Sequence, residues 1–212
     1  MNRFDNIDCM IGMEEYPDKH FDLAIVDPPF FKGVTDKHYF GRGNSNQIQK
    51  PSPWWDKGIP KKKYYEELVR VSKHQIIWGI NYFDSFIKFV GPGRIIWDKL
   101  NDQSNFADAE IASCSLFLKV KIIRHEWNGF LRCETIEKIH PTQKPIKLYK
   151  RLLIDYAKPG DKILDTHVGS ASSLIACEDM GFEYVGFELD KDYYEAAQKR
   201  LTQFRSQLKL AI

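Results

Sequence analysis

Short apolar runs alternate with stretches of helical periodicity along most of the chain. Apolar runs of strand length recur at 21–26, 75–78, 94–97, 163–165 and 184–187. Apolar residues at helical spacing predict helices at 61–73, 81–89, 146–157, 172–180 and 192–208. Strands that alternate with helices favour an α/β fold, in which helices cover both faces of a mostly parallel sheet.

Two parts of the pattern are less regular. Segments 109–120 and 121–125 predict two neighbouring strands, which we expect to pair antiparallel at an edge of the sheet. Residues 6–10 predict a short strand or turn, followed by a weakly helical stretch that ends at Pro17.

A single domain, 1–212, is the expected organisation, because no internal repeat and no clear linker divides the 212 residues. Segment 31–60 replaces the regular pattern with glycine, proline, basic and aromatic residues, and 126–139 is a shorter irregular stretch. Long irregular segments inside domains are usually functional loops or disordered linkers. We interpret 31–60 as a lid or a loop that contacts nucleic acid; a solvated surface insertion is the alternative.

Charge and cysteine content narrow the class of protein. A formal net charge of +2 permits nucleic-acid binding through local patches but does not argue for it. The four cysteines are scattered, so we expect no zinc or other metal site and no disulfide framework. No apolar run approaches the roughly 18 residues of a membrane span, and the N-terminus lacks the layout of a signal peptide. The sequence therefore predicts a cytoplasmic protein without a membrane partner.

The apolar run at 21–26 is followed by an unusual combination of an acid, two prolines and an aromatic residue: Asp27, Pro28, Pro29 and Phe30. Proline fixes φ and has no N–H, so the strand ladder stops there while the carbonyl oxygens remain as acceptors. A carboxylate, rigid carbonyl groups and an aromatic face suit a planar heterocycle with an exocyclic amino group. A strand followed by an ordinary turn is the simpler alternative.

Basic and aromatic residues follow this segment. The candidate nucleic-acid contacts are Lys32, Lys37, Arg42, Trp55, Lys61, Lys62 and Lys63. The lysine triplet opens the predicted helix 61–73, where acidic residues are normally preferred. The triplet could instead serve a phosphate backbone, although a lysine run more often forms a solvated helix face.

The last third of the chain has the order strand, glycine-containing turn, helix, strand and acid. This order is typical of nucleotide-binding units, because the turn allows close approach and the helix N-terminus offers free N–H groups. Glu188 follows Gly169 by about 20 positions, where an acid holds a ribose diol. NAD enzymes share this spacing. The incomplete glycine pattern favours an adenosyl cofactor without phosphates over a dinucleotide.

Together these motifs resemble the S-adenosylmethionine-dependent amino-group DNA methyltransferases of the N6-adenine/N4-cytosine type. Segment 27–30 matches the family's D-P-P-Y/F motif, and 139–145 matches its highly specific H-P-T-Q-K-P motif. Segments 6–10, 164–172 and 186–188 resemble its three cofactor motifs. The catalytic motif precedes the main cofactor motif, so the resemblance implies a Rossmann-like class I methyltransferase fold with the circularly permuted, β-type order.

The resemblance implies methyl transfer to N6 of adenine at specific sites in DNA, as in restriction–modification systems. Asp27 and the Pro28 carbonyl would accept the two amino hydrogens of a flipped base, beside Pro29 and Phe30. Asp rather than Ser at position 27 favours adenine over N4 of cytosine, which is a tendency of the family. The residues implied to bind S-adenosylmethionine are Asp8, Cys9, Met10, His140, Pro141, Thr142, Lys144, Asp165, His167, Gly169, Ser170 and Glu188.

Three positions depart from the family pattern. Thr166 and His167 stand where Pro and Phe are usual, and Ala171 stands where Gly is usual. If position 171 requires a positive φ, alanine there costs on the order of 1 kcal/mol. A non-catalytic DNA-binding subunit of the same fold is therefore an alternative. A dehydrogenase of the NAD type would leave 27–30 and 140–145 without a role, and RNA could replace DNA as substrate.

Target recognition and assembly follow from the same resemblance. Segment 126–139 is too short for an independent DNA-reading domain, so loop 31–60 or a second subunit is expected to contribute, and a homodimer is favoured. The permuted order also predicts that the two sequence ends meet, with helix 192–208 leading toward the strand around Ile7.

Overall fold

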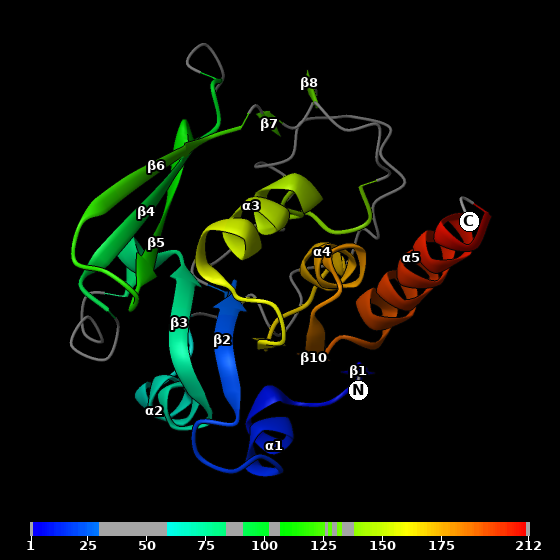
Figure 1. Ribbon diagram of the computed structural model, residues 1–212, viewed down its shortest axis with the longest axis horizontal. Helices are drawn as coiled ribbons and strands as arrows, with labels where there is room; N and C mark the ends of the chain where they lie inside the picture. Colours follow the sequence, from blue (N-terminus) through cyan, green and yellow to red (C-terminus); the bar gives the residue numbers. More distant parts are fainter. Residues whose placement is uncertain are drawn as a thin grey trace.

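A mixed sheet of eight strands forms the centre of the computed structural model, within the residues that it describes: 2–29, 59–83, 91–101, 107–125, 127–128, 131–132 and 138–210 (Figure 1). Its strands are β1 Arg3–Asp5, β2 Phe21–Val26, β3 Ser72–Trp78, β4 Gly93–Asp98, β5 Ala109–Cys114, β6 Val120–Arg124, β9 Lys162–Asp165 and β10 Glu183–Phe187. Their order across the sheet is β1-β10-β9-β2-β3-β5-β4-β6.

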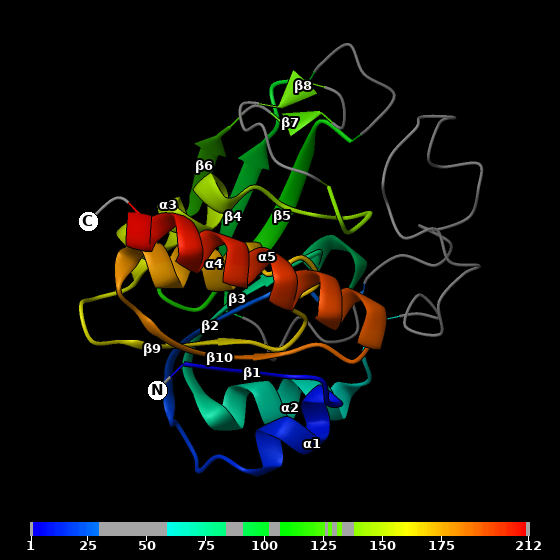
Figure 2. The ribbon, with the colours of Figure 1, turned by 90° about the vertical axis from the view of Figure 1, so that its right-hand side faces the viewer.

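Helices lie on both faces of this sheet. In the described ranges they are α1 Cys9–Glu14, α2 Lys62–Val71, α3 Ile146–Tyr156, α4 Ser172–Met180 and α5 Lys191–Leu210, and a 3₁₀ turn, η2, lies at Ile80–Tyr82. Figure 2 shows α3, α4 and α5 on one side of the sheet and α1 and α2 on the other. None of the helices in the described ranges is both long and apolar enough to cross a membrane.

Two apolar clusters fill the space between the layers. Leu148 and Leu152 of α3 and Leu174 of α4 pack with Ile25, Ile76 and Ile163 from one face of the sheet. Met13 of α1 and Tyr65 and Leu68 of α2 pack with Ala24, Val26 and Ile77 from the other face. Neighbouring residues of β2 thus enter opposite clusters, because side chains alternate along a strand. Burial on both faces explains why the sequence there is continuously apolar.

The predicted α/β class and the mostly parallel sheet are confirmed. Strands β1, β10, β9, β2 and β3 pair parallel, and β5 is antiparallel to both of its neighbours, β3 and β4. The pairing predicted for 109–120 and 121–125 is wrong, because β4 lies between β5 and β6 and pairs parallel with β6. The apolar pattern indicated two strands, although β5 ends at Cys114 and Val120 begins β6. It carries no information about which strand lies between them.

Three other expectations need correction or completion. Residues 6–10 do not form a strand, because β1 ends at Asp5 and Asp8 caps α1 by accepting from the Met10 N–H at 2.8 Å. Of the helix predicted at 81–89, the described residues 81–83 include the end of the 3₁₀ turn η2, and the rest lies outside the described residues. Within 126–139, strands β7 Trp127–Asn128 and β8 Leu131–Arg132 pair with each other.

The two ends of the chain complete one unit, as predicted. Strand β1 pairs parallel with β10, with Arg3 opposite Val185. The ring of Phe4 lies 4.8 Å from the ring of Tyr194 on α5, measured between centroids. The N-terminal strand is therefore held by the last strand and the last helix of the sequence.

The strand order places a crevice at the end of β2 and β9. From β9 the chain continues to β10 on one side, and from β2 it continues to β3 on the other side. In parallel α/β sheets, ligands bind outside the carboxyl ends of the strands where the order reverses in this way. Asp27 follows the carboxyl end of β2, and Asp165 is the last residue of β9.

Candidate active site

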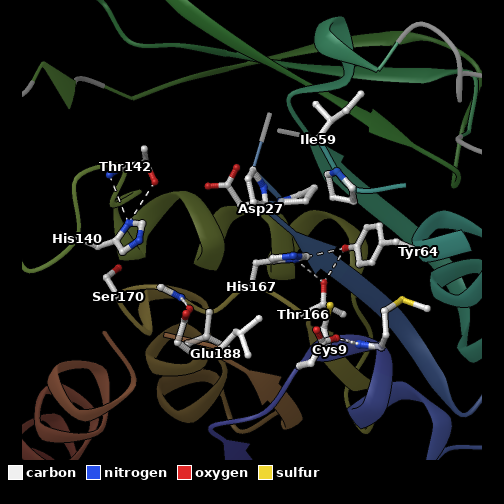
Figure 3. Close-up of a pocket in the computed structure, with 18 of the residues that line it drawn as sticks. Cys9, Asp27, Ile59, Tyr64, His140, Thr142, Thr166, His167, Ser170 and Glu188 are labelled. Carbon is white, nitrogen blue, oxygen red and sulfur yellow. Dashed lines mark hydrogen bonds between the residues drawn. The ribbon is translucent and has the colours of Figure 1, made fainter. Parts of the chain in front are cut away.

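A cavity of about 560 Å³ opens at this crevice. Most of the candidate site residues line it: Asp8, Cys9, Met10, Asp27, Pro28, Pro29, Lys61, Lys63, His140, Thr142, Lys144, His167, Gly169, Ser170 and Glu188. Figure 3 shows Asp27 on one side of the opening and Glu188 and Cys9 on the other. The volume is typical of a site for a nucleotide-sized ligand.

The remaining candidates lie elsewhere. Pro141 and Asp165 are buried next to the cavity and do not line it. Lys62 points away, into an ion pair of 2.6 Å with Glu66 on the same helix. Phe30, Lys32, Lys37, Arg42 and Trp55 lie outside the described residues.

The carboxylate of Asp27 has two oxygens in different situations. Oδ2 accepts a short hydrogen bond from Nζ of Lys144. Oδ1 is buried and has no hydrogen-bond partner among the described residues. Burial raises the pKa of this carboxyl group, and the Lys144 ammonium opposes that shift. An unpaired acceptor of this kind is costly unless a ligand satisfies it.

Lys144 is itself held by a second acid that the sequence analysis did not identify. Its Nζ lies 2.9 Å from Oε2 of Glu110 on β5, and Oε1 of Glu110 lies 2.7 Å from Nζ of Lys99. Burial raises the pKa of Glu110, but Lys144 and Lys99 together outweigh it and bring the pKa to about 2. No motif marks Glu110, because only the pairing of β5 with β4 brings it to this place.

Glu188 organises the opposite side of the cavity. Its Oε2 accepts from the Gly169 N–H at 2.8 Å, and its Oε1 accepts from the Asp190 N–H at 2.9 Å. Burial raises the pKa of Glu188, whereas these N–H groups lower it. A carboxylate has about four lone-pair sites, so two remain for hydroxyl groups of a ligand.

The turn between β9 and α4 requires unusual backbone angles. Gly169 has a φ of +54°, and Ala171, which precedes α4, has a φ of +61°. The alanine therefore occupies the left-handed region, as its departure from the family pattern suggested. The strain is on the order of 1 kcal/mol.

Asp165 stabilises this turn from below. Its Oδ1 accepts from the His167 N–H at 3.0 Å, and its Oδ2 accepts from the Ser173 hydroxyl. Only 2% of the residue is exposed. Burial raises its pKa to about 7, although both hydrogen bonds act in the opposite direction.

His167 belongs to a small polar cluster with Tyr64 and Thr166. The Tyr64 hydroxyl lies 2.7 Å from Oγ1 of Thr166, which in turn lies 2.9 Å from Nδ1 of His167. Burial lowers the pKa of His167 to about 3, so the ring is neutral at pH 7. Within the described ranges, no group of three or more histidine, cysteine or acidic side chains could hold a metal ion. Tyr64 is not among the site residues expected from the sequence.

His140 closes the cavity beside the turn. Its Nδ1 lies 3.2 Å from the Thr142 hydroxyl, and its ring packs edge-on against Tyr193 at 4.4 Å. Burial lowers the pKa of His140 to about 3, with help from Lys138 and Lys144. The neutral ring therefore shapes the wall and carries no charge near pH 7.

These features fit an adenosyl cofactor next to an amine. Glu188 and the Gly169 turn provide acceptors and a close approach for a ribose on one side. Asp27 provides an unsatisfied acceptor on the other side. Burial, together with Asp8, raises the pKa of the Cys9 thiol to about 12, so Cys9 contributes a neutral, apolar surface between them.

Comparison with known proteins agrees with this arrangement. A family model described as DNA methylase, for N6 and N4 modification, matches residues 60–199. The type II methyltransferase M.HinfI of Haemophilus influenzae is 25% identical over 244 residues, which span 93% of this chain and 67% of that protein.

Solved structures share the fold. The M1.HpyAVI–SAM complex has a TM-score of 0.63 at 19% identity, covering 94% of this chain and 100% of that chain. The cytosine-N4-specific PvuII DNA methyltransferase has a TM-score of 0.61 at 12% identity, covering 96% of this chain and 91% of that chain.

Proposed function

Because the chain belongs to the family of DNA methylases that modify N6 of adenine or N4 of cytosine, we propose that it methylates N6 of adenine in DNA with S-adenosylmethionine as the donor. The observation that carries this proposal is Oδ1 of Asp27, a buried acceptor without a described partner on a residue that lines the cavity. The exocyclic amine of a base could supply the hydrogen-bond donor that this oxygen lacks.

Asp27 would act on the amine of a base flipped out of the duplex, which costs a few kcal/mol. Oδ1 accepts one amino hydrogen, and the neighbouring Pro28 carbonyl accepts the other. Both contacts direct the nitrogen lone pair into the cavity and stabilise the positive charge that develops on nitrogen. A strong base is not needed beforehand, because the amine becomes acidic only as it is alkylated.

The residues on the opposite wall would hold the donor. When bound, S-adenosylmethionine supplies a methyl group on a positively charged sulfur. Glu188 would accept from the ribose hydroxyls, and the Gly169–Ser170 turn would approach closely. Asp165 would lie near the amino group of the methionine part, behind the turn that it supports through the His167 N–H and the Ser173 hydroxyl. Asp8, Cys9 and Met10 would border the adenine, with His140, Pro141, Thr142 and His167 around them.

Adenine is proposed over cytosine because the acceptor at position 27 is aspartate. Relatives with serine there tend to act on cytosine. The fold does not separate the two substrates, since the PvuII enzyme of similar fold is specific for N4 of cytosine.

DNA would approach over the rim that Lys61 and Lys63 form. Both side chains line the cavity mouth at the start of α2. Their charges would neutralise phosphates next to the flipped base. Lys62, which pairs with Glu66, is less suited to this role. A second subunit that completes the DNA contact remains our prediction for the assembly.

The direct test is to incubate the protein with labelled S-adenosylmethionine and unmethylated DNA, digest the DNA and identify the labelled nucleoside. We expect N6-methyladenine. Label in N4-methylcytosine would contradict the choice of base, and label in RNA only would contradict the choice of polymer. DNA binding without any transfer would favour the non-catalytic subunit.

A further inference from the structure

Four charged side chains form a continuous chain of contacts that leads from the cavity into the sheet. This charge chain consists of Asp27, Lys144, Glu110 and Lys99. Nζ of Lys144 lies between Oδ2 of Asp27 and Oε2 of Glu110, and Nζ of Lys99 lies beyond, against Oε1 of Glu110. Only 3% of the Lys144 side chain and 22% of the Glu110 side chain are exposed.

The antiparallel strand explains how Glu110 reaches this place. The parallel strands β2, β3 and β4 end at the edge of the sheet that carries the cavity, whereas β5 runs the other way and begins there. Glu110, the second residue of β5, therefore lies opposite Trp97 near the end of β4. Lys99 follows β4 directly. If β5 ran parallel to its neighbours, its second residue would lie at the opposite edge of the sheet. The reversed direction places the Glu110 carboxylate next to Lys144.

Lys144 needs such support, because lysine has a long, flexible side chain and a charge without directional geometry. Its ammonium lies 5.5 Å from the centroid of the Trp78 ring, which fixes it from a third direction. Glu110 holds Nζ from the side opposite to Asp27. Glu110 does not line the cavity and so contacts neither the base nor the donor directly.

We propose that Glu110 is a positioning residue for methyl transfer, which acts by holding Nζ of Lys144 on Oδ2 of Asp27. With Oδ2 occupied in this way, Oδ1 stays free for the amine of the base. The inference rests on the proposed function and extends it to a residue that no motif includes.

The charged residues of the charge chain predict the direction in which each substitution shifts the pKa of Asp27. Burial raises the pKa of Asp27; Lys144 and Lys99 lower it, and Glu110 raises it. Among the described residues, Asp165 and Tyr149 also interact with Asp27. Removing the charge of Glu110 therefore lowers the pKa of Asp27, and removing the charge of Lys99 raises it.

The test is the pH profile of kcat for the full chain and the variants Glu110→Gln and Lys99→Met. The acid limb reports protonation of Asp27, which abolishes its role as a double acceptor. We expect the midpoint of this limb to move down for Glu110→Gln and up for Lys99→Met, each by on the order of one pH unit. We also expect the kcat of Glu110→Gln to fall at least roughly tenfold at the optimum, because misplacement of a catalytic group slows the reaction strongly. Its dissociation constant for S-adenosylmethionine should stay within about threefold of the original value.

Matched controls come from an exposed pair of the same charges on α5, where Lys191 and Glu195 lie 3.8 Å apart. Glu195→Gln and Lys191→Met should leave the profile unchanged. Glu110→Asp, which keeps the charge, should restore the midpoint. If Glu110→Gln does not fold, the upward shift of the midpoint in Lys99→Met and the unmoved midpoint in Glu110→Asp decide.

Each outcome separates the two claims. Methyl transfer with midpoints that do not move, or that move in the same direction, would overturn the role of Glu110 and leave the proposed function standing. Absence of methyl transfer by the unaltered protein would overturn the proposed function and this inference with it.

Discussion

At Asp27, burial and one lysine act on the same carboxyl group in opposite directions. Burial favours the neutral acid, and the Lys144 ammonium favours the carboxylate. The ionised form has one oxygen paired and one available. The residue thus gains its chemistry from Lys144, which is 117 positions away in the sequence, and from burial, which the fold as a whole supplies.

The pKa of Asp165 gives a prediction about stability. In the unfolded chain this group ionises near its ordinary pKa of 3.8, but in the folded protein it keeps its proton up to about pH 7. Between these values the folded state holds a proton that the unfolded state has released. The contribution of Asp165 to the free energy of unfolding is therefore full below pH 4 and is lost as the pH rises toward 7.

We expect Asp165→Asn to remove this loss. When the pH rises from 5 to 7, the free energy of unfolding of the original protein should fall by about 2 kcal/mol relative to that of the variant. Urea denaturation at the two pH values measures the difference. Equal changes in both proteins would contradict a raised pKa for Asp165.

The sequence identified most of the cavity at this scale, because several of its residues lie in motifs. Asp27, Lys144, Gly169 and Glu188 could be named without a structure. Glu110 and Tyr64 could not, because neither lies in a motif. Their roles depend on which strand lies next to β4 and on how α2 faces the turn after β9.

At the scale of elements, the turn after β9 is supported by the end of β10. Glu188 accepts from the backbone of the turn at Gly169 and also stabilises the segment before α5 through the Asp190 N–H. Parallel pairing of β10 with β9 sets these two ends side by side. The apolar pattern predicted both strands and α4 correctly, since they are short, buried and bounded by glycine. It misplaced β6 because strand order is a tertiary property.

We predict that Glu188→Ala weakens binding of S-adenosylmethionine roughly 10- to 100-fold, since hydrogen bonds to a charged group contribute about 1.5–3 kcal/mol. Calorimetry measures the dissociation constant. Glu188→Gln, which keeps an acceptor for the Gly169 N–H, should lose less affinity. The exposed Glu195→Ala is the control. An unchanged dissociation constant in Glu188→Ala would defeat the assignment of this wall to the ribose.

At the scale of the whole molecule, the permuted order of the motifs in the sequence corresponds to one continuous sheet. The N-terminal strand joins the last strand, and the crevice forms between the half that contains β9 and β10 and the half that contains β2 and β3. Asp27, the proposed acceptor for the amine, follows β2 on one half, and Glu188, the proposed acceptor for the ribose, follows β10 on the other. The sheet order therefore places both at one crevice. This relation followed from the motif order in the sequence. The placement of the charge chain did not, because it depends on the reversed direction of β5.

The central claim is that the free oxygen of Asp27 holds the amine that is methylated. The most direct measurement is the single-turnover rate of methyl transfer to DNA by Asp27→Ala, with the exposed Asp18→Ala as control. We predict a loss of at least about 10²- to 10³-fold, as for other groups that stabilise a developing charge, with the affinity for S-adenosylmethionine nearly unchanged. Transfer by Asp27→Ala at the rate of the original protein would contradict the account.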